Sequence, residues 1–323
     1  MTVIFLTIAI AILLLLLAGA TVYMLRFACV RRSDSISVWE SPSMFRASDP
    51  LFEKLGADVT AAREALYAAG KSAEELTLTS ADGLSLKGRL IPSARSETVG
   101  VILMLHGYRS NPTVDFGGIA VKLTEMGFAI LLADQRAHGA SEGRYITYGV
   151  KERYDAVGWC EILAERFPEL PIMLLGLSMG ASTVLMASSL PLPKNVRAVV
   201  ADCGYTTPDA ICRKVMREDL HIPTFPLLHT TKLLARLAAG FSFDGASAAD
   251  SAAASPLPIL LFHGEGDRFV PHSMAEEIAE KTGERCKLYS VPEAGHGRSY
   301  VCDPDGYLEA FKSFSLSTGF RII

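Results

Sequence analysis

A serine, an aspartate and a histidine could form the catalytic group of this chain. Ser178 stands in GLSMG, Asp267 in HGEGDRFVP and His296 in EAGHGRS. A serine hydroxyl is a weak nucleophile until a histidine accepts its proton, and that histidine needs an acid to fix its orientation. Each of the three follows a strand-like apolar run, so they are expected at one edge of a sheet. We therefore predict a triad with Ser178 as nucleophile, His296 as base and Asp267 as acid.

The residues around Ser178 predict a tight turn between a strand and a helix. The apolar run PIMLLGL (171–177) precedes it, and MGASTVLMASSL (179–190) has helical spacing. Such a turn holds the nucleophile above the strand ends, where side chains two positions away would collide with the neighbouring chain. Gly176 and Gly180 occupy those two positions. The start of the helix also directs N–H groups and the positive end of its dipole toward the site.

Asp202 is the alternative to Asp267 as the acid. It ends the apolar run VRAVVAD and therefore also reaches the predicted strand edge. We rank Asp267 first because it follows the penultimate strand and His296 follows the last one, which makes their loops neighbours. His138 and His263 are expected to order the loops beside their own strands.

The elements that position these residues alternate regularly from residue 74 onward. Two strand-like segments flank Asp82-Gly83 and predict a hairpin. Apolar runs and helical patterns then follow one another, which predicts a mostly parallel central sheet with helices on both faces. About 50 residues, at about 206–256, interrupt this order, whereas ~2–6 residues are usual in such a connection. This insertion is expected to cover the site, although part of it could simply pack on the sheet.

The chain from about residue 74 to 315 resembles the α/β-hydrolase superfamily. HGYRSN, DQRAHGASEG, GLSMGAS, HGEGDRFVP and AGHG look like motifs of its bacterial esterase, monoacylglycerol-lipase-like and serine-aminopeptidase-like members, some of which are similarly membrane-anchored. The chain order serine, acid, histidine matches that fold. The resemblance implies a Ser-His-Asp hydrolase with a small helical cap and no cofactor. It also implies an oxyanion hole made by the backbone N–H groups of Tyr108 and Met179.

The first 25 residues carry no charged side chain and include a run of five leucines. A membrane-spanning helix needs about 20 mostly apolar residues, so the segment predicts a single transmembrane anchor at 1–25. The alternative is a cleaved signal peptide, because the small residues at 18–20 resemble a cleavage site. The anchor is favoured because no Lys or Arg precedes the apolar stretch and the stretch continues beyond those small residues.

The residues after this segment bear on the orientation and the domain boundaries. Arg26, Arg31 and Arg32 follow the apolar stretch, so the positive-inside tendency favours a cytoplasmic catalytic domain. Residues 26–73 are predicted to form a linker and, at 51–70, an amphipathic helix that packs on the domain or lies near the membrane surface. The hydrolase domain would occupy 74–323.

Composition narrows the classes of partner. The net charge of −4 and the lack of a long basic run argue against nucleic acid. The six cysteines form no C-x-x-C pair, which argues against a zinc site. They fit reduced thiols better than a disulfide framework, with one bridge left open. The sequence predicts no cofactor and no metal, and it leaves the oligomeric state open.

Three functions remain open at this point. The first is a carboxylic-ester hydrolase with an acyl-enzyme intermediate, and the anchor and the apolar insertion favour small lipid-like or acyl substrates. The second is a serine peptidase for small peptides, which would need an acidic pocket for the amino terminus. Glu218 and Asp219 are the only hint of such a pocket. The third is a non-catalytic membrane binding protein on a hydrolase scaffold, against which an intact triad argues.

Overall fold

The computed structural model describes residues 1–32, 61–70 and 73–323. Its centre is an eight-stranded sheet with the order β1-β2-β4-β3-β5-β6-β7-β8. β1 and β2 pair antiparallel, as do β2 and β4, and the remaining pairs are parallel. The strands are β1 (Glu74–Thr79), β2 (Ser85–Ile91), β3 (Gly100–Leu105), β4 (Phe128–Ala133), β5 (Ile172–Leu177), β6 (Val196–Asp202), β7 (Ile259–Gly264) and β8 (Cys286–Val291).

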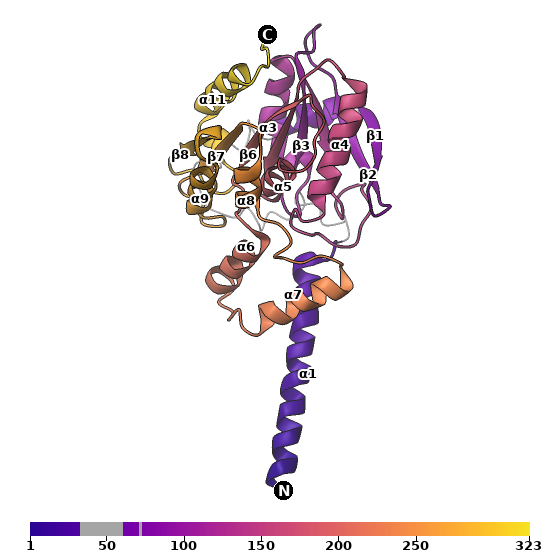
Figure 1. Ribbon diagram of the computed structural model, residues 1–323, viewed down its shortest axis with the longest axis vertical. Helices are drawn as coiled ribbons and strands as arrows, with labels where there is room; N and C mark the ends of the chain where they lie inside the picture. Colours follow the sequence, from indigo (N-terminus) through magenta and orange to yellow (C-terminus); the bar gives the residue numbers. More distant parts are fainter. Residues whose placement is uncertain (33–60, 71–72) are drawn as a thin grey trace.

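Helices cover both faces of this sheet (Figure 1). One face carries α4 (Glu152–Arg166), α5 (Met179–Ala187), α8 (Ala248–Ala254) and α9 (Ser273–Thr282), followed by the short η3 (Gly283–Arg285). The other face carries α3 (Pro112–Glu125), the short α10 (Ser299–Cys302) and α11 (Pro304–Ser317). The predicted hairpin edge and the mostly parallel sheet covered on both faces are therefore confirmed.

The sheet separates two apolar cores because its central strands are buried on both sides. Along β3, Val101, Leu103 and Leu105 contribute to one core, and Ile102 and Met104 to the other. This alternation is the period of a pleated strand. The run GVILML is apolar throughout because both faces of the strand are buried.

The N-terminal helix α1 (Thr2–Cys29) projects from one end of the domain (Figure 1). Of the described helices, it is the one long and apolar enough to cross a membrane. Every side chain from residue 2 to 16 is exposed, and the first buried ones are Thr21, Leu25 and Cys29. The helix runs four residues beyond the predicted boundary at residue 25 because its last two turns pack against the domain that contains the sheet.

The insertion predicted at about 206–256 contains α6 (Pro208–Lys214), the π-helical turn η2 (Val215–Asp219), α7 (Leu227–Ala238) and α8. α7 crosses α1 (Figure 1), and the Thr230 and Thr21 hydroxyl oxygens lie 2.7 Å apart. α8 packs against α5 and α9 and contributes Ala248, Ala249 and Ala252 to the core of the domain. α6 and α7 stand off the sheet (Figure 1), and their Ile211 and Ala235 reach the same core.

The predicted linker and the first half of the predicted amphipathic helix lie outside the described residues. Residues 61–70 are helical. Leu66 is buried in the core beside α3, and the Arg63 guanidinium donates to the Val114 carbonyl at 3.2 Å. This described half therefore packs on the domain.

Candidate active site

Ser178 lies between β5 and α5 with a backbone φ of +55°. A non-glycine residue in this region is strained, and the surrounding contacts must hold it there. Its N–H donates to the Asp202 carbonyl at 2.8 Å. A Cβ at Gly176 would come within 2.2 Å of the Gly180 carbonyl oxygen, and one at Gly180 within 1.8 Å of the Leu105 oxygen. Glycine at both positions is what allows the turn to close.

The structure brings Ser178, His296 and Asp267 together. The His296 ring follows β8, and its Nε2 lies 2.9 Å from the Ser178 Oγ. Its Nδ1 lies 2.7 Å from the Asp267 Oδ2. The Asp267 side chain is buried, whereas 26% of the His296 side chain is exposed. The imidazole is thus held at one nitrogen by a buried carboxylate, while part of its ring is open to solvent.

The loop after β7 stabilises Asp267 as an anion. Its Oδ1 accepts hydrogen bonds from the Phe269 and Val270 N–H groups, both at 2.9 Å. The His263 Nε2 lies 3.3 Å from its Oδ2. Burial alone would raise the pKa of this carboxyl, but the hydrogen bonds from His263 and His296 outweigh burial and hold the pKa well below its usual range.

Asp202 lies one strand away and makes a different set of contacts. Its Oδ1 accepts a hydrogen bond from the Ser299 hydroxyl at 2.8 Å, and no ring nitrogen of a described histidine bonds to it. Burial raises its pKa to about 6, although the Ser299 hydrogen bond opposes this shift. The Asp202 backbone carbonyl supports the Ser178 turn, while its side chain bonds to Ser299.

The predicted oxyanion donors lie on two segments next to Ser178: Tyr108 follows Gly107, where an added Cβ would lie 3.3 Å from the Ser178 Cβ, and Met179 begins α5. Within the described part of the chain, neither the Tyr108 N–H nor the Met179 N–H has a hydrogen-bond acceptor. Met179 is the first residue of α5, so its N–H also lies at the positive end of the helix dipole. Both N–H groups are therefore available to a further hydrogen-bond acceptor.

Asp115, a buried carboxylate that shapes the loop carrying Tyr108, was not predicted from the sequence. Its Oδ2 accepts the Gly107 N–H at 2.6 Å, and its Oδ1 accepts the Ser110 hydroxyl at 2.5 Å. Burial raises the pKa of this carboxyl, while those hydrogen bonds oppose the shift. Asp115 stands in the first turn of α3, where a carboxylate is commonly just a dipole partner. Its role therefore gave no separate sequence signal.

The contact between the end of α1 and this loop was not predicted from the sequence either. The Ala28 carbonyl accepts hydrogen bonds from the Tyr108 hydroxyl at 2.8 Å and from the Tyr148 hydroxyl at 2.9 Å. The two tyrosine rings stack with centroids 5.4 Å apart. The Arg109 guanidinium also bonds the Phe27 carbonyl. The last turn of α1 thus supports the loop that carries Tyr108.

Two buried histidines link this loop, which follows β3, to the loop after β4. The His138 Nε2 accepts the Arg109 N–H at 3.0 Å, and the His106 Nε2 accepts the Gln135 N–H at 3.1 Å. Burial lowers the pKa of His106 to about 4 and that of His138 to about 3. Both rings are therefore neutral near pH 7, as their role as acceptors requires.

One group of potential metal ligands occurs among the described residues, namely Cys203, Asp267 and His296. Their donor atoms lie within 4.8 Å of one another. The carboxylate and the imidazole already bond to each other in the triad, and burial raises the pKa of the Cys203 thiol well above its usual value. A neutral thiol is a poor metal ligand, so we assign no metal to this group.

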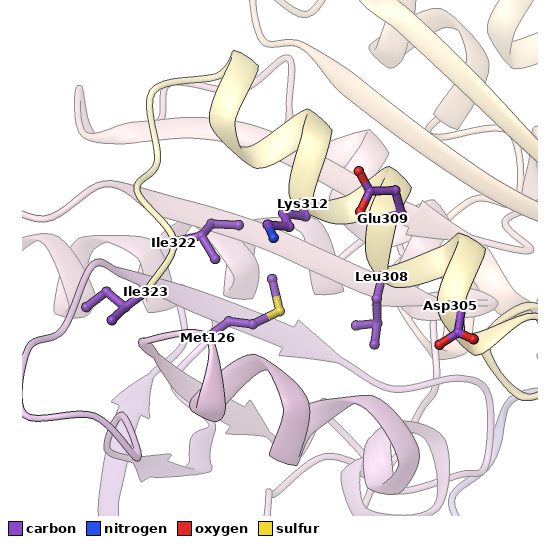
Figure 2. Close-up of a pocket in the computed structure, with 7 residues that line it drawn as sticks. All are labelled: Met126, Asp305, Leu308, Glu309, Lys312, Ile322 and Ile323. Carbon is purple, nitrogen blue, oxygen red and sulfur yellow. The ribbon is translucent and has the colours of Figure 1, made fainter.

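An open groove of about 390 Å³ lies elsewhere, between α11 and the end of α3 (Figure 2). Met126, Leu308 and Lys312 are among the residues that line it. Met126 precedes β4, so the groove is at the amino ends of the parallel strands, whereas Ser178 follows the carboxyl end of β5. None of the triad residues lines it.

Comparisons with known proteins agree with this fold. The family model "Serine aminopeptidase, S33" matches residues 96–222. The uncharacterized protein YqkD of Bacillus subtilis is 25% identical over 238 residues, which cover 73% of this chain and 77% of YqkD. The monoacylglycerol lipase of Mycolicibacterium smegmatis is 26% identical over 205 residues, which cover 53% of this chain and 71% of the lipase.

A solved structure shares the architecture. The esterase Pf2001 of Pyrococcus furiosus superposes with a TM-score of 0.63 at 24% sequence identity, and the match covers 76% of this chain and 91% of the esterase. The predicted α/β-hydrolase fold is confirmed, and the family model and the relatives support a member of the α/β-hydrolase superfamily.

Proposed function

We propose that this protein is a serine hydrolase that cleaves carboxylic esters. The observation that carries the proposal is the position of His296, with one ring nitrogen on the Ser178 hydroxyl and the other on the Asp267 carboxylate. This arrangement activates a serine because the imidazole is fixed in the tautomer that accepts the hydroxyl proton.

The reaction then proceeds in two halves. The Ser178 Oγ attacks the ester carbonyl while His296 accepts its proton, and the negative oxygen of the tetrahedral intermediate accepts hydrogen bonds from the Tyr108 and Met179 N–H groups. His296 then donates the proton to the leaving alcohol, which leaves an acyl-enzyme. Water, deprotonated by His296, attacks the acyl carbon and releases the acid. Asp267 stays ionised throughout and stabilises the imidazolium in both halves.

The surroundings of His296 favour an apolar group on the substrate. The Phe269 ring is partly exposed and lies edge-on to the His296 ring, with centroids 5.0 Å apart. Lys214 of α6 reaches this ring, with its Nζ 5.8 Å from the Phe269 centroid, so the insertion stands over this side of the triad. An acyl chain or other lipid-like group would fit here better than a charged one.

The nearest alternative is a serine peptidase, which the name of the matching family model suggests. A peptidase that takes a free amino terminus needs an unpaired acid near the site. Of the two acids in η2, Asp219 is paired with the Lys214 ammonium at 2.7 Å. Because Asp219 is already paired, it is not available to bind a free amino terminus, and this favours an ester hydrolase over a peptidase.

We further propose that α1 is an uncleaved membrane anchor and that the catalytic domain faces the cytoplasm. The exposed apolar length of α1 supports the anchor. The three arginines after the apolar stretch support the orientation. All six cysteines, each within the described residues, are free thiols, as is usual in a reducing compartment. Carbonate extraction and an intact mass test the anchor; a soluble chain that begins near Thr21 would show a signal peptide instead.

The catalytic proposal is tested with a fluorophosphonate probe and p-nitrophenyl esters of increasing chain length. The purified full-length protein should be labelled and should turn over at least one ester. Ser178→Ala should abolish both, and Ser182→Ala, a matched change in α5, should retain labelling. Turnover by Ser178→Ala would exclude Ser178 as the nucleophile. A fully folded parent chain that is neither labelled nor active would favour the non-catalytic binding protein.

A further inference from the structure

We infer that the outer face of α7 is a membrane-docking surface whose partner is the lipid bilayer that holds α1. The inference rests on the proposed anchor. The surface consists of Phe225, Leu233 and Leu237, which are 74%, 59% and 75% exposed. Phe225 packs against the His229 ring, which is one turn before Leu233 in α7, so the three side chains follow one another along the helix. Exposing them to water is unfavourable, and such patches mark interaction sites.

The spacing of α7 places these leucines on the side away from the domain. Leu228, Thr231 and Ala235 are the buried side of the helix. Leu233 and Leu237 are one turn apart on the opposite side, and Arg236 is exposed beside them. The helix thus presents leucines with a neighbouring guanidinium, a combination typical of helices that lie in the boundary between acyl chains and headgroups.

The length of α1 indicates where along the helix the boundary between acyl chains and headgroups would lie. Residues 2–20 of the helix span about 28 Å, at 1.5 Å per residue, close to the ~30 Å thickness of the hydrocarbon core. Thr21 is the first buried residue, and its hydroxyl contacts Thr230 in α7 at 2.7 Å. α7 therefore crosses α1 where α1 would leave the hydrocarbon.

The arrangement of the elements leaves this face open toward the membrane. α7 lies on the side of the domain from which α1 projects, and only α1 and the loop before α7 extend further in that direction (Figure 1). Phe225 belongs to that loop. The bilayer that surrounds α1 is thus the partner that would cover the three side chains, and it would hold the insertion over the site at the membrane surface.

Fluorescence quenching in proteoliposomes tests this inference with the full-length chain. Leu233→Trp and Leu237→Trp are each reconstituted with lipids brominated near the headgroup end of the acyl chains. Ile12→Trp, in the middle of the exposed part of α1, reports the anchor, and lipids brominated at mid-chain are used for it. Leu316→Trp, exposed on α11 at the far end, is the matched control. Each variant must retain fluorophosphonate labelling, and emission is compared with the parent chain.

The expected result is a loss of the added emission for Leu233→Trp and Leu237→Trp comparable to that for Ile12→Trp, with Leu316→Trp unchanged. No quenching at 233 and 237 while Ile12→Trp is quenched would overturn the docking surface and leave the anchor intact. The face would then be covered by protein, such as a second copy of the chain, which sedimentation in detergent would reveal. No quenching of Ile12→Trp would overturn the anchor and the docking surface together.

Discussion

The carboxyl ends of β6 and β7 are adjacent, yet the pKa values of the aspartates beside them, Asp202 and Asp267, are shifted in opposite directions. Asp267 accepts two backbone N–H groups and contacts two imidazoles, which hold its pKa well below the usual range. Asp202 is equally buried but has one hydroxyl partner, and its pKa rises to about 6. Burial penalises both carboxylates, so the number and charge of the donors decide which one stays an anion.

This difference distinguishes a carboxylate that can stabilise a neighbouring imidazolium from carboxylates that only hold the local structure in place. A triad acid must remain ionised while the imidazolium forms beside it, as the Asp267 environment allows. Asp202 and Asp115 instead hold the backbone and the hydroxyl groups around Ser178 in place. Substitutions at the three positions should therefore affect turnover and stability in different proportions.

The largest effect is expected for Asp267→Asn. The amide cannot stabilise the imidazolium and favours the wrong tautomer of His296, so kcat/KM should fall by about 10⁴-fold. Steady-state kinetics on the best p-nitrophenyl ester measures the change, and a thermal unfolding scan controls for folding. A fall of less than about tenfold in a folded variant would show that Asp267 is not the acid.

A smaller effect is expected for Asp115→Ala. The Gly107 N–H and the Ser110 hydroxyl lose their acceptor, so the loop that carries the Tyr108 N–H loosens. We expect kcat to fall by about 10- to 100-fold, less than the ~10²–10³-fold cost of removing an oxyanion donor outright. Asp115→Asn, which keeps an acceptor oxygen, should lose less. If KM rather than kcat changes, the loop serves substrate binding and not the oxyanion.

Asp202→Asn should lower kcat/KM by less than about tenfold, because this carboxyl does not touch the His296 ring. A loss as large as that of Asp267→Asn would reverse the two assignments. Ser299→Ala, which removes the single hydroxyl partner of the carboxyl, should behave similarly.

The pH dependence of stability should also distinguish the two aspartates. The pKa of Asp202 is raised to about 6 on folding, so its contribution to stability is complete below pH ~4 and is lost as the pH rises through about 6. A shift of roughly two units corresponds to about 3 kcal/mol. Asp202→Asn should therefore gain stability relative to the parent between pH 4 and pH 7 in thermal unfolding.

For Asp267 we expect the opposite pH dependence of stability. Its pKa is lowered, so its stabilisation is present above pH ~4 and is lost only as the pH falls further, through its folded value. Asp267→Asn should accordingly be less stable than the parent at pH 7. The same dependence of stability on pH in Asp202→Asn and Asp267→Asn would contradict the opposite pKa shifts of the two aspartates.

The smallest effect is expected for Tyr108→Phe. Its hydroxyl donates to the Ala28 carbonyl, but the Tyr148 hydroxyl still satisfies that oxygen in the variant. The free energy of unfolding should fall by about 1 kcal/mol, and turnover should fall by only a few-fold. Tyr148→Phe is the matched control. Loss of all turnover in a folded Tyr108→Phe would give the hydroxyl a direct role in the reaction.

The sequence by itself determined the features that depend on neighbours along the chain. The glycines beside Ser178, the apolar period of the strands and the uncharged N-terminal segment each predict their element because the physical cause is local. The alternation of strands and helices was enough to predict the sheet and its covered faces. The strand that precedes each of Ser178, Asp267 and His296 was also readable from these patterns.

The tertiary structure decided which groups meet across the chain. Asp202 and Asp267 end similar apolar strands, and only the paths of the loops after β7 and β8 bring the Asp267 carboxylate, and not that of Asp202, to the His296 Nδ1. Asp115 and the last turn of α1 contact the loop that carries Tyr108, and Ala28 and Tyr108 are far apart in sequence. No local pattern encodes such contacts, because they depend on how the whole sheet and its helices pack.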